Sequence, residues 1–290
     1  MKVSVALCTY NGGNFIEEQL ESILSQTIPV NEIIICDDYS IDQTLSIINK
    51  FIDNYPSIIK LLKNEVNVGA KKSFEKAIKF ASGDLVFLSD QDDIWLENKV
   101  EVYLEYFKNN KKCLLLFSDA ILIDSDSNDL SGSLWENINF NNEVQLYWKS
   151  NQNIISDLIK NHNKVTGATV CFRRKIIKKI LPFDLPFNYW HDAWMTLIAA
   201  RENGVHFIKD KLTKYRIHSN QQIGLTSGHL LKNNKKFFEI SENEFSLTLL
   251  KLFPKHKKDI FERYGNHRAN YIFTLINDIK RIIKKYLIKI

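Results

Sequence analysis

Short apolar runs alternate with amphipathic stretches over the first 120 residues of the chain. Four of these runs are nearly unbroken, as expected for parallel strands that are covered on both faces. They span residues 3–8, 32–36, 58–62 and 84–88. Between them, apolar positions recur at three- and four-residue steps, which is typical of helices packed on a sheet. This βαβαβαβ alternation predicts an α/β fold with a mostly parallel central sheet, right-handed crossovers and flanking helices.

The pattern loosens after residue 117. Residues 124–142 are rich in Asn, Asp and Ser and predict a mobile surface segment. Strands are expected at residues 166–172 and 211–217, with a helix over residues 190–203 between them. From residue 229 onward the chain is dense in lysine and carries only helical signals. The sequence thus predicts a main domain over residues 1–228, with halves at about 1–120 and 121–228, and a basic helical extension over 229–290.

Three polar loops each follow the carboxyl end of a predicted strand, at residues 9–13, 37–40 and 89–93. Because parallel strands end at one edge of a sheet, we expect these loops to converge there and to open onto a ligand crevice. The third loop holds Asp90, Asp92 and Asp93. Like charges this close resist burial unless a cation lies among them, and an Asp-x-Asp fits Mg²⁺ or Mn²⁺ carrying a diphosphate. The alternative is that Asp92 or Asp93 caps the next helix.

Composition narrows the class of protein. The chain has 290 residues, 44% of them hydrophobic, and a formal net charge of +5. The lysines and arginines are not interleaved with an aromatic stacking platform, so nucleic acid is not an expected partner. The four cysteines lie in apolar runs and predict buried free thiols in a reducing compartment. No signal-peptide core and no window of about 18 apolar residues is present, which predicts a cytoplasmic protein.

Several polar side chains of the first two loops are candidates for holding a nucleotide, namely Thr9, Tyr10, Asn11 and Asp38. A carboxylate can accept the N3–H of a pyrimidine, and a tyrosine ring can stack on a base. Gly69, in a further small loop, would let the backbone approach a ligand closely. The alternative for Asp38 is a plain turn residue that leads into the following helix.

Two candidates come from the second half of the chain. Asp192 follows His191 between large aromatic residues, where it is either a general base in a half-apolar pocket or a helix cap. Arg216 suits bidentate phosphate contact and His218 suits metal ligation, although an Arg-x-His pair on a strand is commonly structural.

Taken together, the motifs resemble family 2 glycosyltransferases of the GT-A fold. The resemblance rests on Val-Ala-Leu-Cys-Thr-Tyr-Asn-Gly at residues 5–12, Ile-Cys-Asp-Asp-Tyr-Ser at 35–40 and Leu-Ser-Asp-Gln-Asp-Asp-Ile-Trp at 88–95. Thr166-Gly167, Trp190-His191-Asp192 and Tyr215-Arg216-Ile217-His218 extend it to about residue 224. Within the family, the chain is most similar to bacterial rhamnosyltransferases of surface-polysaccharide synthesis.

The resemblance implies an inverting, metal-dependent transfer of rhamnose or another hexose from a nucleotide-diphosphate donor to a glycan or lipid-linked acceptor. It assigns the nucleotide-sugar donor to the first half of the domain and the acceptor to the second. Thr9, Tyr10 and Asp38 would hold the nucleotide, and Asp192 would be the catalytic base. Asp90 and Asp92, with Asp93 beside them, would hold Mn²⁺ or Mg²⁺ on the diphosphate. Many relatives carry Glu-Asp where this chain carries His191-Asp192. The alternative is a non-catalytic sugar-nucleotide or glycan-binding module on the same fold.

The end of the chain carries an apolar stripe at helical spacing, with lysines and arginines at most other positions. The stripe consists of Ile279, Ile282, Ile283, Tyr286, Leu287 and Ile290. A basic amphipathic helix of this kind binds the interface of an anionic membrane, which would place the enzyme at the inner face of the cell membrane. The alternative is that the stripe packs on the catalytic domain or on a second copy in a homo-oligomer.

Overall fold

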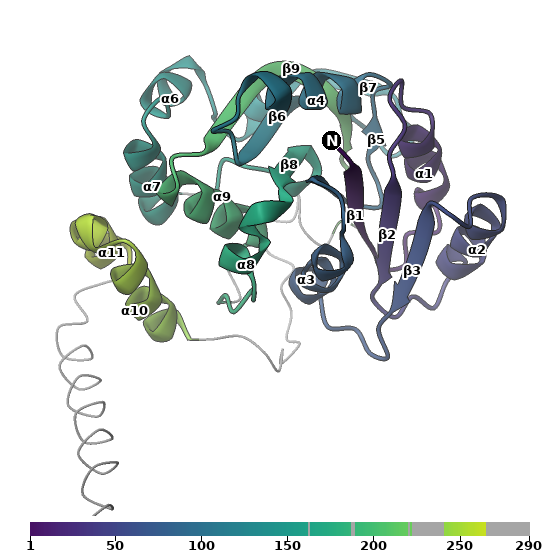
Figure 1. The fold of residues 1–290 in the computed structure, drawn as a ribbon, viewed down its shortest axis with the longest axis horizontal. Coiled ribbons are helices and arrows are strands. Elements are labelled where there is room, and N and C mark those ends of the chain that lie inside the picture. Colours follow the sequence, from purple (N-terminus) through teal and green to yellow (C-terminus); the bar gives the residue numbers. More distant parts are fainter. Residues whose placement is uncertain (162, 187–188, 220, 222–240, 265–290) are drawn as a thin grey trace, which may run out of the picture.

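The computed structural model describes residues 1–161, 163–186, 189–219, 221 and 241–264. Figure 1 shows β1, β2 and β3 with α1 and α2 on one side of the molecule, and α7, α9, α10 and α11 on the other. The strands form one nine-stranded sheet, with β7 paired to β6 outside the main order β3-β2-β1-β4-β8-β6-β9-β5.

The first half of the chain forms the parallel part of this sheet. Its strands are β1 (Val3–Thr9), β2 (Glu32–Asp37), β3 (Ile59–Lys63) and β4 (Leu85–Ser89). The intervening helices are α1 (Ile16–Leu24), α2 (Thr44–Asn54) and α3 (Ala70–Phe80). All three neighbouring strand pairs are parallel, so the predicted α/β alternation is confirmed.

The strands that follow β4, most of them in the second half, make the sheet a mixed one. They are β5 (Ile94–Trp95), β6 (Leu115–Ile123), β7 (Asp129–Ser133), β8 (Val170–Arg173) and β9 (Val205–Arg216). β8 enters antiparallel between β4 and β6, and only β9 runs parallel to its neighbour β6. The α/β class is therefore confirmed, with parallel pairing concentrated in the first half because the strands of the second half enter in both directions.

Helices and 3₁₀ turns connect these strands. They are α4 (Lys99–Asn109), α5 (Leu134–Asn137), α6 (Asn142–Tyr147), α7 (Asn151–Lys160), η1 (Gly167–Thr169), η2 (Arg174–Ile176), α8 (Ile177–Ile180), α9 (His191–Arg201), α10 (Glu242–Leu252), η3 (Pro254–His256) and α11 (Lys257–Tyr264). The prediction of a mobile segment over residues 124–142 is wrong. That stretch contains β7 and α5, and it is fixed by the buried side chains of Leu134 and Trp135.

The core lies on both faces of the sheet, which explains the unbroken apolar runs of the sequence. In β1, Val5 and Leu7 join the core on one face, whereas Ala6 and Cys8 join the core on the other. Side chains alternate between the faces of a strand, so a strand buried on both sides needs apolar residues at every position. The four cysteines are buried free thiols, as predicted.

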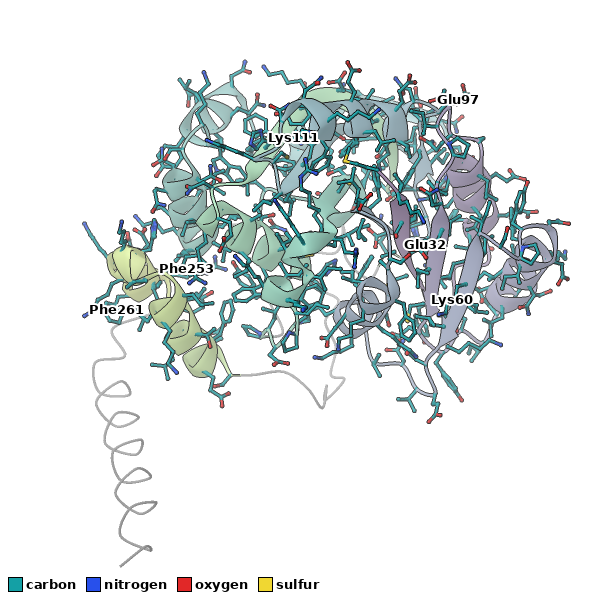
Figure 2. The ribbon with its side chains drawn as sticks, in the orientation of Figure 1. Glu32, Lys60, Glu97, Lys111, Phe253 and Phe261 are labelled. Carbon is teal, nitrogen blue, oxygen red and sulfur yellow. The ribbon has the colours of Figure 1, made fainter. Side chains whose placement is uncertain are left out.

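The C-terminal helix α11 packs beside α7, and α10 packs on α11. Figure 2 marks Phe253 and Phe261 on this side of the molecule, opposite Glu32 and Lys60 of the parallel half. No helix within the described residues is both long and apolar enough to cross a bilayer. The predicted boundary at residue 228 and the amphipathic stripe that begins at residue 279 lie outside the described residues.

Candidate active site

The three polar loops converge at the carboxyl edge of β1, β2 and β4, as the sequence predicts. Gln91 joins two of them, because its Oε1 atom accepts from the Thr9 hydroxyl at 2.7 Å and from the Tyr10 backbone N–H at 2.8 Å. The Asn11 backbone N–H donates to the Ser40 hydroxyl at 2.9 Å and so joins the loop after β1 to the loop after β2. The candidate nucleotide-binding residues of the first loop are thereby held in place by their neighbours.

Asp38 organises a fourth loop that leads into α3. Its Oδ1 atom accepts from the Val68 backbone N–H at 2.8 Å and from the Asn64 amide at 2.9 Å. Its Oδ2 atom accepts from the Gly69 backbone N–H at 2.7 Å. Gly69 has φ 86°, a conformation that favours glycine, and it precedes the first turn of α3. The structure thus joins Asp38 and Gly69 directly, while their contact with a nucleotide stays a prediction.

The acidic loop after β4 combines burial with mutual repulsion. Burial, followed by the charges of Asp92 and Asp192, raises the pKa of Asp90 to about 7. Burial and the neighbouring carboxylates of Asp92 and Asp90 also raise the pKa of Asp93 well above its usual range. Asp92 Oδ2 lies 2.9 Å from His218 Nε2. The structure therefore brings the four predicted metal-ligating residues to one place.

Asp93 and Asp90 differ in how their oxygens are used. Asp93 Oδ1 accepts from the Arg216 backbone N–H at 3.0 Å, so this side chain anchors the loop to the end of β9. Its Oδ2 atom is buried without a hydrogen-bond partner in the described part of the chain. No hydrogen bond to the Asp90 carboxylate is found among the described residues, which leaves it available to a ligand.

Arg216 ends β9, on the predicted strand, but its side chain makes other contacts than the predicted one. Its side chain is fully buried, and its guanidinium donates to the Asp92 carbonyl at 2.7 Å and to Glu18 Oε2 at 2.6 Å. The remaining donor, Nη1, contacts the Asp124 and Ser125 carbonyls and the Ser127 hydroxyl. The prediction of a phosphate contact is corrected: the protein already uses these donors, so Arg216 fixes the acidic loop instead.

Asp192 lies in the first turn of α9 and is partly buried. Its Oδ1 atom accepts from Asn163 Nδ2 at 2.7 Å, and its Oδ2 atom accepts from the Gly167 backbone N–H at 3.1 Å. Burial raises the pKa of Asp192 to about 7, although these hydrogen bonds to the charged form oppose the rise. The alternative of a helix cap is met in part: the N-cap position of α9 is Trp190, but Asp192 Oδ1 also accepts from the Ala193 backbone N–H in the first turn at 2.7 Å.

The neighbour of Asp192 differs in character. His191 is buried, stacks on Phe74 at a centroid distance of 4.5 Å, and has no hydrogen-bond partner for either ring nitrogen among the described residues. Burial, together with the charge of Lys71, lowers its pKa to about 3, so the ring is neutral. His191 therefore packs as a neutral ring, where a glutamate would bring a charge.

Lys99 and Asn163 are residues that sequence reasoning missed. The Lys99 ammonium is fully buried and donates to the Ala168 carbonyl and the Thr213 hydroxyl, each at 2.8 Å. Burial lowers its pKa to about 7. It joins the turn that contains Gly167 to β9 beneath the acidic loop. A lysine within the apolar stripe of the predicted helix after Trp95 is the signal that could have identified it.

The residues present fit a divalent cation. Within the described residues, no group of three or more His, Cys, Asp and Glu side chains is arranged so that these side chains alone could hold a metal ion. Mg²⁺ is usually held by one or two carboxylates together with substrate phosphates, so a complete protein site is not required. Asp90 and Asp92 supply such oxygens, and the Oδ2 atom of Asp93, which has no hydrogen-bond partner among the described residues, is a further oxygen in the same loop.

Curated relatives of the chain are glycosyltransferases. UDP-Glc:alpha-D-GlcNAc-diphosphoundecaprenol beta-1,3-glucosyltransferase WfgD of Escherichia coli is 29% identical over 217 residues, which are 74% of this chain and 77% of that protein. The dTDP-rhamnosyl transferase RfbG of Shigella flexneri is 31% identical over 238 residues, covering 75% of this chain and 73% of that protein.

Solved structures share the fold. The S. aureus TarS 1-349 structure in complex with UDP-GlcNAc has a TM-score of 0.60 and 20% identity, and covers 93% of this chain and 69% of that one. Mannosyltransferase PcManGT from Pyrobaculum calidifontis, in complex with GDP-Man and Mn²⁺, has a TM-score of 0.51 and 16% identity, with coverages of 90% and 67%. The chain spans 60% to 69% of the solved TarS 1-349 chains.

A family model extends over most of the domain described above. The model of glycosyl transferase family 2 matches residues 4–181, a stretch that includes β1 through β8 and the whole acidic loop. With a GT-A-type fold and glycosyltransferases as its curated relatives, the chain belongs to glycosyl transferase family 2 and is a transferase.

Proposed function

We propose that the chain transfers a sugar from a nucleotide-diphosphate donor to a glycan or lipid-linked acceptor, with inversion at the anomeric carbon and with the help of Mn²⁺ or Mg²⁺. The observation that carries the proposal is the pairing of an acidic loop with a separate buried carboxylate. The charge of Asp192 reaches Asp90 strongly enough to raise its pKa. A cation-binding loop and a base thus share one site at the edge of the sheet.

Asp192 takes the proton from the acceptor hydroxyl while that oxygen attacks the anomeric carbon, and the nucleoside diphosphate leaves from the opposite face. A general base works best when its pKa lies near the working pH, and the pKa of Asp192 is about 7. Asn163 and Gly167 orient the carboxylate. Asp90 and Asp92, with His218 beside them, would hold the cation, which supplies positive charge to the departing diphosphate. Thr9, Tyr10, Asn11, Asp38 and Gly69 would contact the nucleotide.

The relatives narrow the candidate substrates. WfgD is named as a glucosyltransferase that uses UDP-Glc and acts on alpha-D-GlcNAc-diphosphoundecaprenol, and RfbG is named as a dTDP-rhamnosyl transferase. By analogy, we propose UDP-glucose or dTDP-rhamnose as donor and a lipid-diphosphate-linked saccharide as acceptor. An enzyme that acts on such an acceptor would work at the cytoplasmic face of the cell membrane, in surface-polysaccharide synthesis.

The test is a transfer assay with the full chain over a panel of UDP-glucose, UDP-N-acetylglucosamine, dTDP-rhamnose and GDP-mannose. Each donor is offered with a synthetic N-acetylglucosamine-diphospholipid acceptor and Mn²⁺, with EDTA as the control. We expect transfer from one donor class and its loss in EDTA. Donor binding without any transfer or hydrolysis over the panel would instead support the alternative of a non-catalytic binding module.

A further inference from the structure

Arg263 joins the C-terminal helix α11 to the C-terminal end of α7. The Nη1 atom of Arg263 in α11 donates to the backbone carbonyls of Asn161 at 2.7 Å and Ile159 at 3.1 Å. These carbonyls lie at the C-terminal end of α7, where the helix itself provides no donors. A cation is favourable at this end of a helix, because the helix dipole places partial negative charge there. Arg263 thus caps the C-terminal end of α7.

A residue that follows α7 contacts the proposed base Asp192. Asn163, two positions beyond Asn161, donates from Nδ2 to Asp192 Oδ1 and to the Val165 carbonyl, each at 2.7 Å. Its own Oδ1 atom accepts from the Val165 backbone N–H at 3.0 Å. Val165 thus sets the orientation of the Asn163 amide, which holds one oxygen of the proposed base and lies two positions beyond the last carbonyl that Arg263 contacts.

A second set of contacts joins α10 to the aromatic residues around Asp192. Phe245 of α10 is fully buried. Its ring lies 4.6 Å from the ring of Tyr189 and 6.0 Å from that of Trp194, measured between centroids. These two aromatic residues flank Asp192 in the sequence, one just before α9 and one in its first turns. Phe245 therefore packs on the segment from which the base projects.

Further contacts hold α11 and the preceding 3₁₀ turn η3 on α7. Lys160 forms ion pairs with Asp259 at 3.2 Å and with Glu262 at 3.0 Å, and His256 Nε2 lies 3.0 Å from Gln152 Oε1. Pairs this exposed contribute little stability by themselves. They do select one position for α11 along α7, on the side of the molecule seen in Figure 1.

We propose that α10 and α11 position the catalytic base, with Arg263 and Phe245 as positioning residues that act through Asn163 and through the aromatic residues around Asp192. The inference rests on the proposed role of Asp192 as base. It assigns a function to a part of the chain beyond the match to the family model, which ends at residue 181.

The test compares variants of the full chain by transfer from the donor that the panel selects and by calorimetric titration with UDP, or with dTDP for a dTDP-sugar donor, in Mn²⁺. Arg263→Met should lower kcat about ten-fold, less than the loss of the base itself, because a displaced base is still present. Nucleotide affinity should stay within about two-fold of wild type, since the donor loops lie on β1, β2 and β4. Arg263→Lys, which keeps a cation at the end of α7, should recover most of the rate.

Lys258→Met is the matched control, because it removes an exposed positive charge from the same helix and should leave kcat unchanged. If Arg263→Met does not fold by circular dichroism, Phe245→Leu tests the other contact with the same readouts. A wild-type kcat in folded Arg263→Met, or an equal loss of kcat and of nucleotide affinity, overturns the inference. Full activity of Asp192→Asn would instead overturn the proposed function, so the two failures are distinguishable.

Discussion

At the scale of single residues, the environment of Asp192 predicts how transfer depends on pH. Burial raises the pKa of this carboxyl to about 7, and a base must be ionised to accept a proton. The rate should therefore be full above this pKa and fall about ten-fold per pH unit below it. Measuring kcat from pH 5 to 9 in saturating Mn²⁺ tests this. A wild-type rate that is flat down to pH 5 contradicts the assignment. In a separate test, the variant Asp192→Asn should lose about 10²- to 10⁴-fold in kcat and keep its nucleotide affinity.

The acidic loop predicts a different effect for Asp92. Asp92→Asn removes one carboxylate from the proposed cation site, the one that contacts His218, so it should weaken Mn²⁺-dependent UDP binding as well as turnover. Titration of UDP with and without Mn²⁺ separates this effect from simple unfolding. We expect the UDP affinity of the variant to be the same with and without Mn²⁺, and to match the affinity of wild type in EDTA. Turnover of wild type that persists unchanged in EDTA would exclude a role for the cation.

Replacing Arg216 should lower the stability of the fold and should not cause a specific loss of phosphate binding. Its guanidinium supplies hydrogen bonds to the acidic loop, to residues 124–127 and to Glu18, and its planar shape cannot be replaced by an ammonium. Arg216→Lys should cost about 2–3 kcal/mol of unfolding free energy, mainly from buried carbonyls left without donors. The ion pair adds little, because Glu18 is 45% exposed. Urea unfolding measures the change, and an unchanged midpoint would contradict it.

At the scale of elements, the donor loops depend on one glycine. A Cβ atom at Gly12 would lie 2.2 Å from Gln91 Oε1 and 3.0 Å from the Thr9 hydroxyl oxygen. Gly12→Ala should therefore displace Gln91, separate the loops after β1 and β4, and weaken UDP binding about ten-fold without unfolding the sheet. Gln91→Ala alone should have a similar effect. Because the clash needs both side chains, the double variant should bind UDP no more weakly than Gln91→Ala; additive losses would contradict this mechanism.

Sequence patterns predicted the elements of the first half far better than those of the second. Strands buried on both faces, such as β1 and β2, carry continuous apolar runs that cannot be overlooked. β7 consists of Asp129–Ser133 and is exposed over most of its length, so it has no periodic signal. β9 begins at Val205, six residues before the predicted start, because polar residues 209–211 interrupt its pattern. Short or exposed strands are defined by their partners, which the sequence does not show.

The predicted site residues follow the same division. Thr9 ends a buried strand, Asp38 and Asp90 directly follow one, and their convergence follows from strand order alone. The role of Arg216 did not follow, because its partners Glu18 and Asp124 are distant in sequence. Asn14 with Glu17 and Ser40 with Gln43 have the spacing of capping boxes, but the N-caps of α1 and α2 are Phe15 and Gln43, without a side-chain hydrogen bond. Ser40 instead accepts a hydrogen bond from the first loop. Contacts between loops thus outweighed local signals at the site.

At the scale of the whole molecule, the site is assembled from parts that are far apart in the chain. The acidic loop follows β4, its anchor Arg216 ends β9, and the proposed base Asp192 lies in the first turn of α9. Lys99 joins the turn before β8 to β9 beneath them. Each half alone would lack either the base or the loop, so the two halves of the domain must fold together for transfer to occur.

The end of the chain yields a prediction about location. Residues 278–290 combine the apolar stripe with Lys280, Arg281, Lys284, Lys285 and Lys289. Such a segment gains from burying apolar side chains in a membrane interface and from meeting anionic lipid, and the second gain is screened by salt. Wild type should sediment with phosphatidylglycerol vesicles at low salt and less so at high salt, whereas a chain ending at residue 277 should remain in solution and keep its kcat on a water-soluble acceptor. As a matched control, exchange of the five basic residues for glutamine should abolish sedimentation while the apolar stripe is retained. If wild type never sediments, or if the truncated chain unfolds, the segment packs on protein instead.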